Sequence, residues 1–176
     1  MELIFGGAMK RFETFKNIEK YVNRLYSFYK KSHKRNNSLR DFLKAQSKTP
    51  FSLSKIFDIR WVSSQLISML KLTSNYEMLL KHLALITQSK GFNEKSKNEA
   101  KALIKFLMNK HVLSHIYFNM DLQELFKKES KFFQNRHGSI LGNSHRRSDL
   151  KTNIEALKIR NGQHLKKFLR IVSTLD

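Results

Sequence analysis

The chain has 176 residues, which suffices for one domain with a hydrophobic core and is too short for two of ordinary size. Its 34 lysines and arginines face only 14 acidic residues, and the formal net charge of +20 predicts a nucleic acid as partner before an acidic protein. The lack of cysteine excludes disulfides and thiolate metal sites, and the sequence shows neither a signal-peptide pattern nor an apolar run of membrane-spanning length, so we expect no secretion and no membrane partner.

The composition favours helices. Hydrophobic residues make up 40% of the chain, which is enough to form a core. With one proline and six glycines, the chain has few of the turn residues that separate short strands. We therefore expect an all-α fold of five to six helices, with one short strand near residues 55–60 as the exception that the pattern leaves open.

The first predicted helix covers residues 12–29. A second, shorter helix is predicted over residues 38–45, with Ser38 as its cap. Pro50 follows, and residues 51–59 form either a short strand or an irregular turn. The apolar residues of the first helix recur three and four positions apart, which is the period of an amphipathic helix: Phe15, Ile18, Val22, Leu25 and Tyr29.

The longest periodic stretch, residues 62–83, predicts a single helix with heptad-like spacing. Gly91 ends the pattern, and Asn93 is placed to cap a further helix that continues to residue 107. A bend is predicted at residues 109–111, where the next apolar series begins.

That series, residues 113–133, predicts another helix, which Gly138 ends. The small and polar residues 138–148 favour an exposed loop, and a last helix is predicted over residues 150–172.

Catalytic patterns are missing from the sequence. His111 and His115 are four residues apart without the glutamate of the zinc-protease pattern, and Gly6 and Gly7 are not followed by the residues of a phosphate-binding loop. The acidic residues are scattered among lysines and arginines, so no cluster suits divalent cations. We expect no metal, no cofactor and no enzymatic activity.

Two basic groups are the positive signal for binding. The first follows the aromatic residues at the end of the first helix, and the second lies in the last third of the chain. Contact with nucleic acid, a solvated surface and a nuclear-import signal all explain such groups. The first group is Lys30, Lys31, Lys34 and Arg35, and the second is Arg146, Arg147, Lys166, Lys167 and Arg170.

Residues 60–64 read Arg-Trp-Val-Ser-Ser, and Phe-Asp-Ile precedes them at residues 57–59. This block is similar to the Arg-Trp motif of hAT-superfamily transposases and their domesticated descendants. Residues 1–7, residues 22–29 and Ser32 resemble the family's stretch before the motif. Residues 119–125, Ser130 and residues 133–134 resemble a later segment, so the resemblance covers nearly the whole chain.

The resemblance implies a helical insertion within an interrupted RNase H-like domain. Residues 1–58 would flank the RNase H-like scaffold, and residues 59–176 would be the insertion. Trp61 would stack on an unpaired or flipped base and Arg60 would contact a phosphate or polar group. The alternative is that Trp61 anchors a helix in the core and Arg60 pairs with a carboxylate such as Asp58.

The acidic catalytic residues of the family fall outside the matched blocks. We therefore expect a catalytically incomplete fragment of a transposase-like protein that is nuclear and binds DNA through basic helical surfaces. A remnant that binds or dimerises with related chains, through the face of residues 62–83, is one alternative, and a non-functional translated fragment is another.

Overall fold

The computed structural model describes residues 13–57, 61–134 and 140–173, and leaves out the side chains of Trp61, residues 129–147 and Lys158. These ranges contain eight α-helices and no strand, so the predicted all-α class is confirmed and the predicted count of five to six helices is wrong. The helices are α2 (Glu13–Lys30), α3 (His33–Ala45), α4 (Trp61–Ser74), α5 (Tyr76–Gln88), α6 (Glu94–Leu107), α7 (Lys110–Gln134), α8 (Ile140–Ile159) and α9 (Gln163–Ser173).

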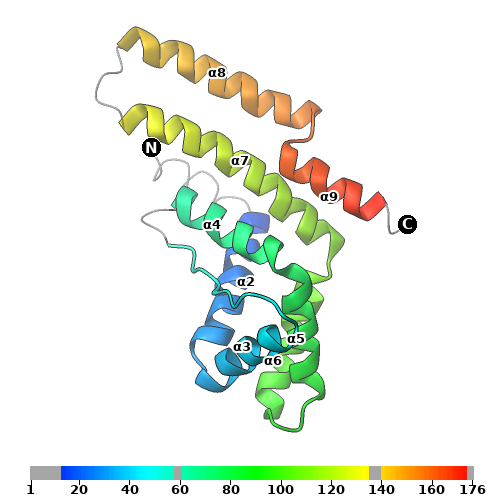
Figure 1. Cartoon of the computed structure of the whole chain (residues 1–176). Helices are drawn as coiled ribbons and strands as arrows, with labels where there is room; N and C mark the ends of the chain where they lie inside the picture. Colours follow the sequence, from blue (N-terminus) through cyan, green and yellow to red (C-terminus); the bar gives the residue numbers. More distant parts are fainter. Residues whose placement is uncertain (1–12, 58–60, 135–139, 174–176) are drawn as a thin grey trace.

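Helix α7 is the axis of the arrangement. Figure 1 shows α8 and α9 along one side of α7 and α4 along the other, while α2, α3, α5 and α6 gather at the far end of the molecule. Helix α5 packs against α6, and α3 packs against both α2 and α5. The C-terminal helix α9 thus lies well apart from the α2–α3 corner.

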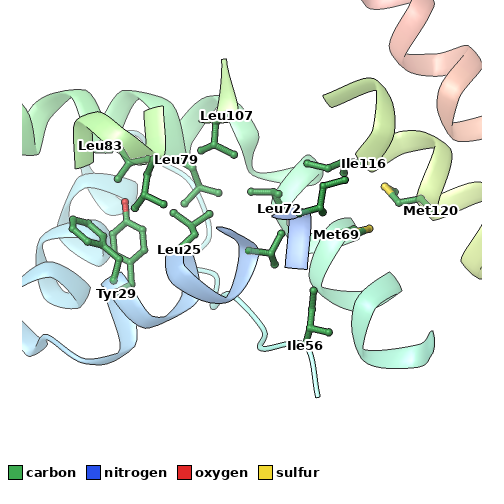
Figure 2. Packing of buried hydrophobic residues seen from close by; sticks show 14 of the residues in the cluster. Leu25, Tyr29, Ile56, Met69, Leu72, Leu79, Leu83, Leu107, Ile116 and Met120 are labelled. Carbon is green, nitrogen blue, oxygen red and sulfur yellow. The ribbon is translucent and has the colours of Figure 1, made fainter. Parts of the chain in front are cut away.

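Among the described residues, one hydrophobic core joins helices α2 to α7. Side chains from α2, α4, α5, α6 and α7 point toward one another in Figure 2. Leu79, Leu83 and Leu103 are fully buried, and Ile18 and Ile116 are at most 1% exposed. The core contains residues from both sides of residue 58, and the division of the chain there stays a prediction.

Two local predictions are confirmed. In α2, Ile18, Val22, Leu25 and Tyr29 are buried, as their spacing indicates. Asn93 caps α6, because its side-chain oxygen accepts a hydrogen bond from the backbone N–H of Ser96 at 2.9 Å.

The prediction of one helix over residues 62–83 is wrong, because Asn75 separates α4 from α5. Side chains at the end of α4 bond to its backbone carbonyls: Thr73 Oγ1 donates to the oxygen of Met69 at 3.0 Å, and Asn75 Nδ2 donates to that of Lys71 at 2.8 Å. In a continued helix the carbonyl of Lys71 would accept from the backbone N–H of Asn75, which here donates to the carbonyl of Leu72 at 3.3 Å instead. The two helices then pack on different neighbours, α7 and α6.

Helix α3 begins earlier than predicted. Ser32, rather than Ser38, is its cap, and its hydroxyl accepts a hydrogen bond from the backbone N–H of Arg35 at 3.3 Å. Residues 33–37 have no apolar member, so hydrophobic spacing could not reveal this first turn.

A short strand near residues 55–60 was the other expectation for this segment. Residues 51–57 form neither strand nor helix, and residues 58–60 lie outside the described ranges. Asn23 on α2 binds the backbone of Ile56 in place of a neighbouring strand. Its Oδ1 accepts from the N–H of Ile56 at 2.8 Å, and its Nδ2 donates to the carbonyl at 3.5 Å.

The loop predicted at residues 138–148 is helical from Ile140 onward, because α8 includes this segment. The helix predicted over residues 150–172 is in fact two helices, α8 and α9, separated at residues 160–162. The reason lies on α7, where the buried carboxylate of Asp121 accepts hydrogen bonds from the backbone N–H groups of His164 at 2.9 Å and Leu165 at 3.0 Å. Asp121 therefore caps α9 and fixes where it begins.

Candidate nucleic-acid interface

The structure does not bring all the predicted binding residues onto one surface. Arg60 lies outside the described residues, and Trp61 is described only as the first residue of α4. Arg146 and Arg147 are part of α8 rather than of a loop, and their side chains also lie outside the description. The remaining residues form two separate groups, one at the α2–α3 corner and one on α9 (Figure 1).

At the α2–α3 corner the four cations differ in environment. Lys30 and Lys31 are exposed. Lys34 donates to the backbone carbonyl of Gly91, and its ammonium lies 5.4 Å from the ring centroid of Phe92. This lysine therefore attaches α3 to the loop before α6.

Arg35 is the most constrained member of this group. Its Nε donates to the carbonyl of Phe28 at 2.6 Å and its Nη1 to the hydroxyl of Ser96 at 2.9 Å. The guanidinium also lies 4.4 Å from the ring centroid of Phe28. Three contacts thus hold the guanidinium in place between α2 and α6, a geometry that lysine could not reproduce.

Beside Arg35, helices α2, α3 and α6 enclose a pocket of about 350 Å³. Four cationic side chains and one carboxylate line it, so its walls carry a net charge of +3. The ionised residues are Arg24, Lys31, Arg35, Lys95 and Glu99.

Arg24 and Glu99 form a two-pronged ion pair on one wall of the pocket. Arg24 Nε and Nη2 donate to the two carboxylate oxygens of Glu99 at 2.5 and 2.7 Å. This hydrogen bonding is the main cause that lowers the pKa of the Glu99 carboxyl; burial opposes the shift, and the charges of Arg24, Arg35 and Lys95 add to it. Glu99 therefore remains ionised and balances Arg24, and none of the other three cations has an ion pair with a carboxylate among the described residues.

Arg24 and Lys95 line the pocket but were not among the predicted binding residues. Arg24 and Lys31 are seven residues apart and hence on one face of α2 extended by a turn, which is a usable signal. Lys95 lies in the first turn of α6, where the helix dipole disfavours a cation. Only the fold shows that these residues meet.

The second group lies on α9. Lys166, Lys167 and Arg170 are exposed, and helical spacing places them opposite the stripe that packs on α7. Within that stripe the ring of Phe168 stacks on that of Tyr117, with centroids 5.0 Å apart. Helix α9 is thus attached through one face and presents a basic face to solvent.

A metal centre has no support in the ranges covered by the structure, where no three residues of the types histidine, cysteine, aspartate and glutamate form a group able to hold an ion. His115 instead donates through Nδ1 to the backbone carbonyl of His111 at 2.7 Å. No described helix combines the length and the apolar character needed to cross a membrane.

In comparison with known proteins, no protein-family model matches the chain, and no solved structure matches it.

Proposed function

We propose that this chain binds DNA through exposed basic helical surfaces and has no catalytic activity of its own. The observation that carries the proposal is the outward face of α9, where three cations lie within little more than one helical turn. None of the three has an ion pair with the part of the chain that is described. Such an array suits the regularly spaced phosphates of a nucleic-acid backbone.

The net charge of +20 supports the same proposal, because self-repulsion of that size disfavours a compact state unless an anionic partner offsets it. Backbone contacts of this kind give affinity without sequence readout. We therefore expect binding that depends strongly on salt and weakly on DNA sequence.

We further propose that the chain is a catalytically incomplete, nuclear fragment of an hAT transposase-like protein. The support is the order of the blocks around Arg60 and Trp61, together with the lack of an acidic cluster in the sequence. In this proposal Trp61 stacks on an exposed base and Arg60 contacts the backbone beside it.

Pairing with a related chain is less well supported as a function. The face of residues 62–83 that would pair is largely occupied by the chain itself, since Val62, Met69 and Leu83 are fully buried in its core. A partner helix would have to use another surface.

The α9 proposal is tested by fluorescence anisotropy with a short DNA duplex at several salt concentrations. Replacing Lys166, Lys167 and Arg170 with glutamine should weaken binding and reduce the slope of log affinity against log salt by about 0.9 for each phosphate that the variant no longer neutralises. The control replaces three exposed lysines elsewhere, Lys44, Lys101 and Lys105, and removes the same charge.

A larger decrease in affinity for the α9 variant than for the control supports the proposal. Equal decreases in the two variants would show that charge alone, rather than the α9 face, determines binding. Affinity that stays constant between about 50 and about 300 mM salt would contradict DNA binding through phosphates altogether.

A further inference from the structure

The pocket between α2, α3 and α6 differs in kind from the α9 face. The face of α9 is the convex surface of one helix, whereas the pocket is a concavity to which three helices contribute cations. Lys31 follows α2, Arg35 belongs to α3 and Lys95 belongs to the first turn of α6. A single small anion in the pocket would therefore have positive charge on several sides.

The Arg35 guanidinium is held in place before any ligand binds. Within the described part of the chain, Arg35 donates hydrogen bonds only through Nε and Nη1. Three of its five N–H donors therefore remain for a ligand. Its contact with the ring of Phe28 fixes the plane in which those donors lie. Little side-chain ordering then remains to oppose binding, in contrast to an exposed lysine.

The Arg24–Glu99 ion pair forms another wall of the pocket, and the N-terminus of α6 adds positive charge to it. The ion pair of Arg24 with Glu99 closes the pocket on the α6 side and keeps the carboxylate from pairing with Lys31 or Lys95. The positive end of the α6 dipole lies at the same place, because Asn93, Lys95 and Ser96 all line the pocket.

We propose that this pocket binds a phosphate group at the end of a chain or molecule, a terminal phosphate rather than the phosphodiester of a continuous strand. A terminal phosphate has up to two negative charges and three free oxygens, which match the three cations that have no carboxylate partner within the described ranges. The volume of about 350 Å³ leaves room for the sugar attached to it.

Two sources supply this chemistry, the 5′-phosphate of a DNA strand and a free phosphate compound. The first source rests on the proposed function, since it requires the chain to bind DNA. The second is independent of it, and the experiment includes one arm for each.

The test variant replaces Lys31 and Lys95 with glutamine. Both side chains are exposed, and neither forms a hydrogen bond or ion pair with the part of the chain that the structure describes, so folding should be preserved. The matched control replaces Lys166 and Lys167, two exposed lysines of α9, and removes the same charge from a different surface. Thermal unfolding of both variants checks that the fold is intact.

In the first arm, anisotropy compares a short DNA strand labelled at its 3′ end with and without a 5′-phosphate, at one salt concentration. The wild type should bind the phosphorylated strand about tenfold more tightly, the effect of one good charge-assisted contact. K31Q/K95Q should abolish this preference, whereas K166Q/K167Q should weaken both strands and keep the ratio. A wild-type ratio near one, or a ratio that the pocket variant leaves intact, overturns the 5′-phosphate source.

In the second arm, inorganic phosphate is titrated at constant ionic strength while backbone amide signals are followed by NMR. Shifts concentrated at Asn93, Lys95 and Ser96 in the wild type, and abolished in K31Q/K95Q, support the pocket even if DNA does not bind. Shifts spread evenly over the basic surface, or equal shifts in both variants, overturn it. Failure of DNA binding with localised phosphate shifts would thus refute the proposed function and leave the pocket standing.

Discussion

Acidification should destabilise this protein through one buried side chain, His82 on α5. The ring is fully buried, and both of its nitrogens have a partner: Tyr29 Oη lies 3.0 Å from Nδ1, and Ser38 Oγ lies 3.0 Å from Nε2. Burial raises the pKa of the Tyr29 hydroxyl, which therefore keeps its proton. The hydroxyls of Tyr29 and Ser38 can each donate or accept, so together they satisfy both nitrogens of the neutral ring.

Burial is what disfavours a second ring proton. Desolvation penalises the charged ring and lowers the pKa of His82 to about 4 from its usual 6.5, while the hydrogen bond with Ser38 opposes this shift. The folded state therefore favours the neutral side chain, which links α2, α3 and α5.

The sign of the pH effect follows from the two states. Below a pH of about 6.5 the unfolded chain takes up a proton at His82, while the folded chain does not do so until the pH reaches about 4. Stability is therefore present above this window and is lost as the pH falls through it. A difference of about 2.5 pKa units at about 1.36 kcal/mol each gives a loss of about 3 kcal/mol.

The assay is urea unfolding followed by circular dichroism, from about pH 7 to about pH 4, for the wild type and for His82→Gln. The variant cannot titrate at this position, so the difference between the two curves removes the general effect of added positive charge. The wild type should lose about 3 kcal/mol more than the variant across the window. Tyr29→Phe, which lacks the hydroxyl bonded to Nδ1, should lower the free energy of unfolding by about 1–2 kcal/mol near pH 7 and still show the acid loss. Parallel curves for wild type and His82→Gln would refute the reasoning.

Three further predictions concern the packing of α9 and the core. Gly162→Ala should destabilise the chain by about 1–3 kcal/mol, because an added Cβ would overlap the carboxylate of Asp121, and limited proteolysis should show α9 released first. Asp121→Ala should lower the free energy of unfolding by about 1–2 kcal/mol, because it removes the cap of α9. In that variant Gly162→Ala should lower it by less than in the wild type. Additive losses in urea unfolding would contradict the overlap. Leu83→Ala should cost about 2–5 kcal/mol, whereas Leu85→Ala, on the same helix and 42% exposed, should stay within about 0.5 kcal/mol; similar losses would show that α5 packs differently.

The parts of the fold that hydrophobic spacing predicts are those where one helix face is buried along its length. The limits of α2 lie within one residue of the prediction, because Ile18, Val22 and Leu25 all contact the same core. Spacing cannot reveal where a helix stops when the pattern continues across a break. At the break the side chain of Asn75 takes the carbonyl of Lys71 that a continued helix would use, and the break leaves the heptad-like spacing unchanged.

The limits of α9 depend on residues distant in the sequence. Gly162 looks like an ordinary glycine, yet it lies against the carboxylate of Asp121 more than forty residues earlier. Likewise, the basic run that contains Lys31 and Arg35 does not reveal that these two residues line one pocket. Nor does it reveal that Arg35 is held in place, because the groups that hold it belong to α2 and α6.

The few acidic residues help to explain why so much positive charge remains exposed. Glu99 joins α2 to α6 through Arg24, while on α7 Asp121 caps α9 and Glu124 lies 3.0 Å from His164 Nε2. These carboxylates hold helices together and so are not free to balance the lysines on the surface. Mutual repulsion of those lysines opposes folding, and a ligand that binds only the folded chain would offset it.

Cations that serve binding and cations that stabilise the fold should respond differently when they are neutralised. Neutralising a cation that holds the fold, such as Arg35, removes its bonds to Phe28 and Ser96 and must lower stability. Neutralising Lys166 or Lys167 removes repulsion without breaking a bond within the described chain, so stability should hold or rise while DNA affinity falls. Stability should fall on neutralisation of Arg35 and should hold or rise on neutralisation of the α9 lysines. That difference separates the structural cations from those that the proposed function requires.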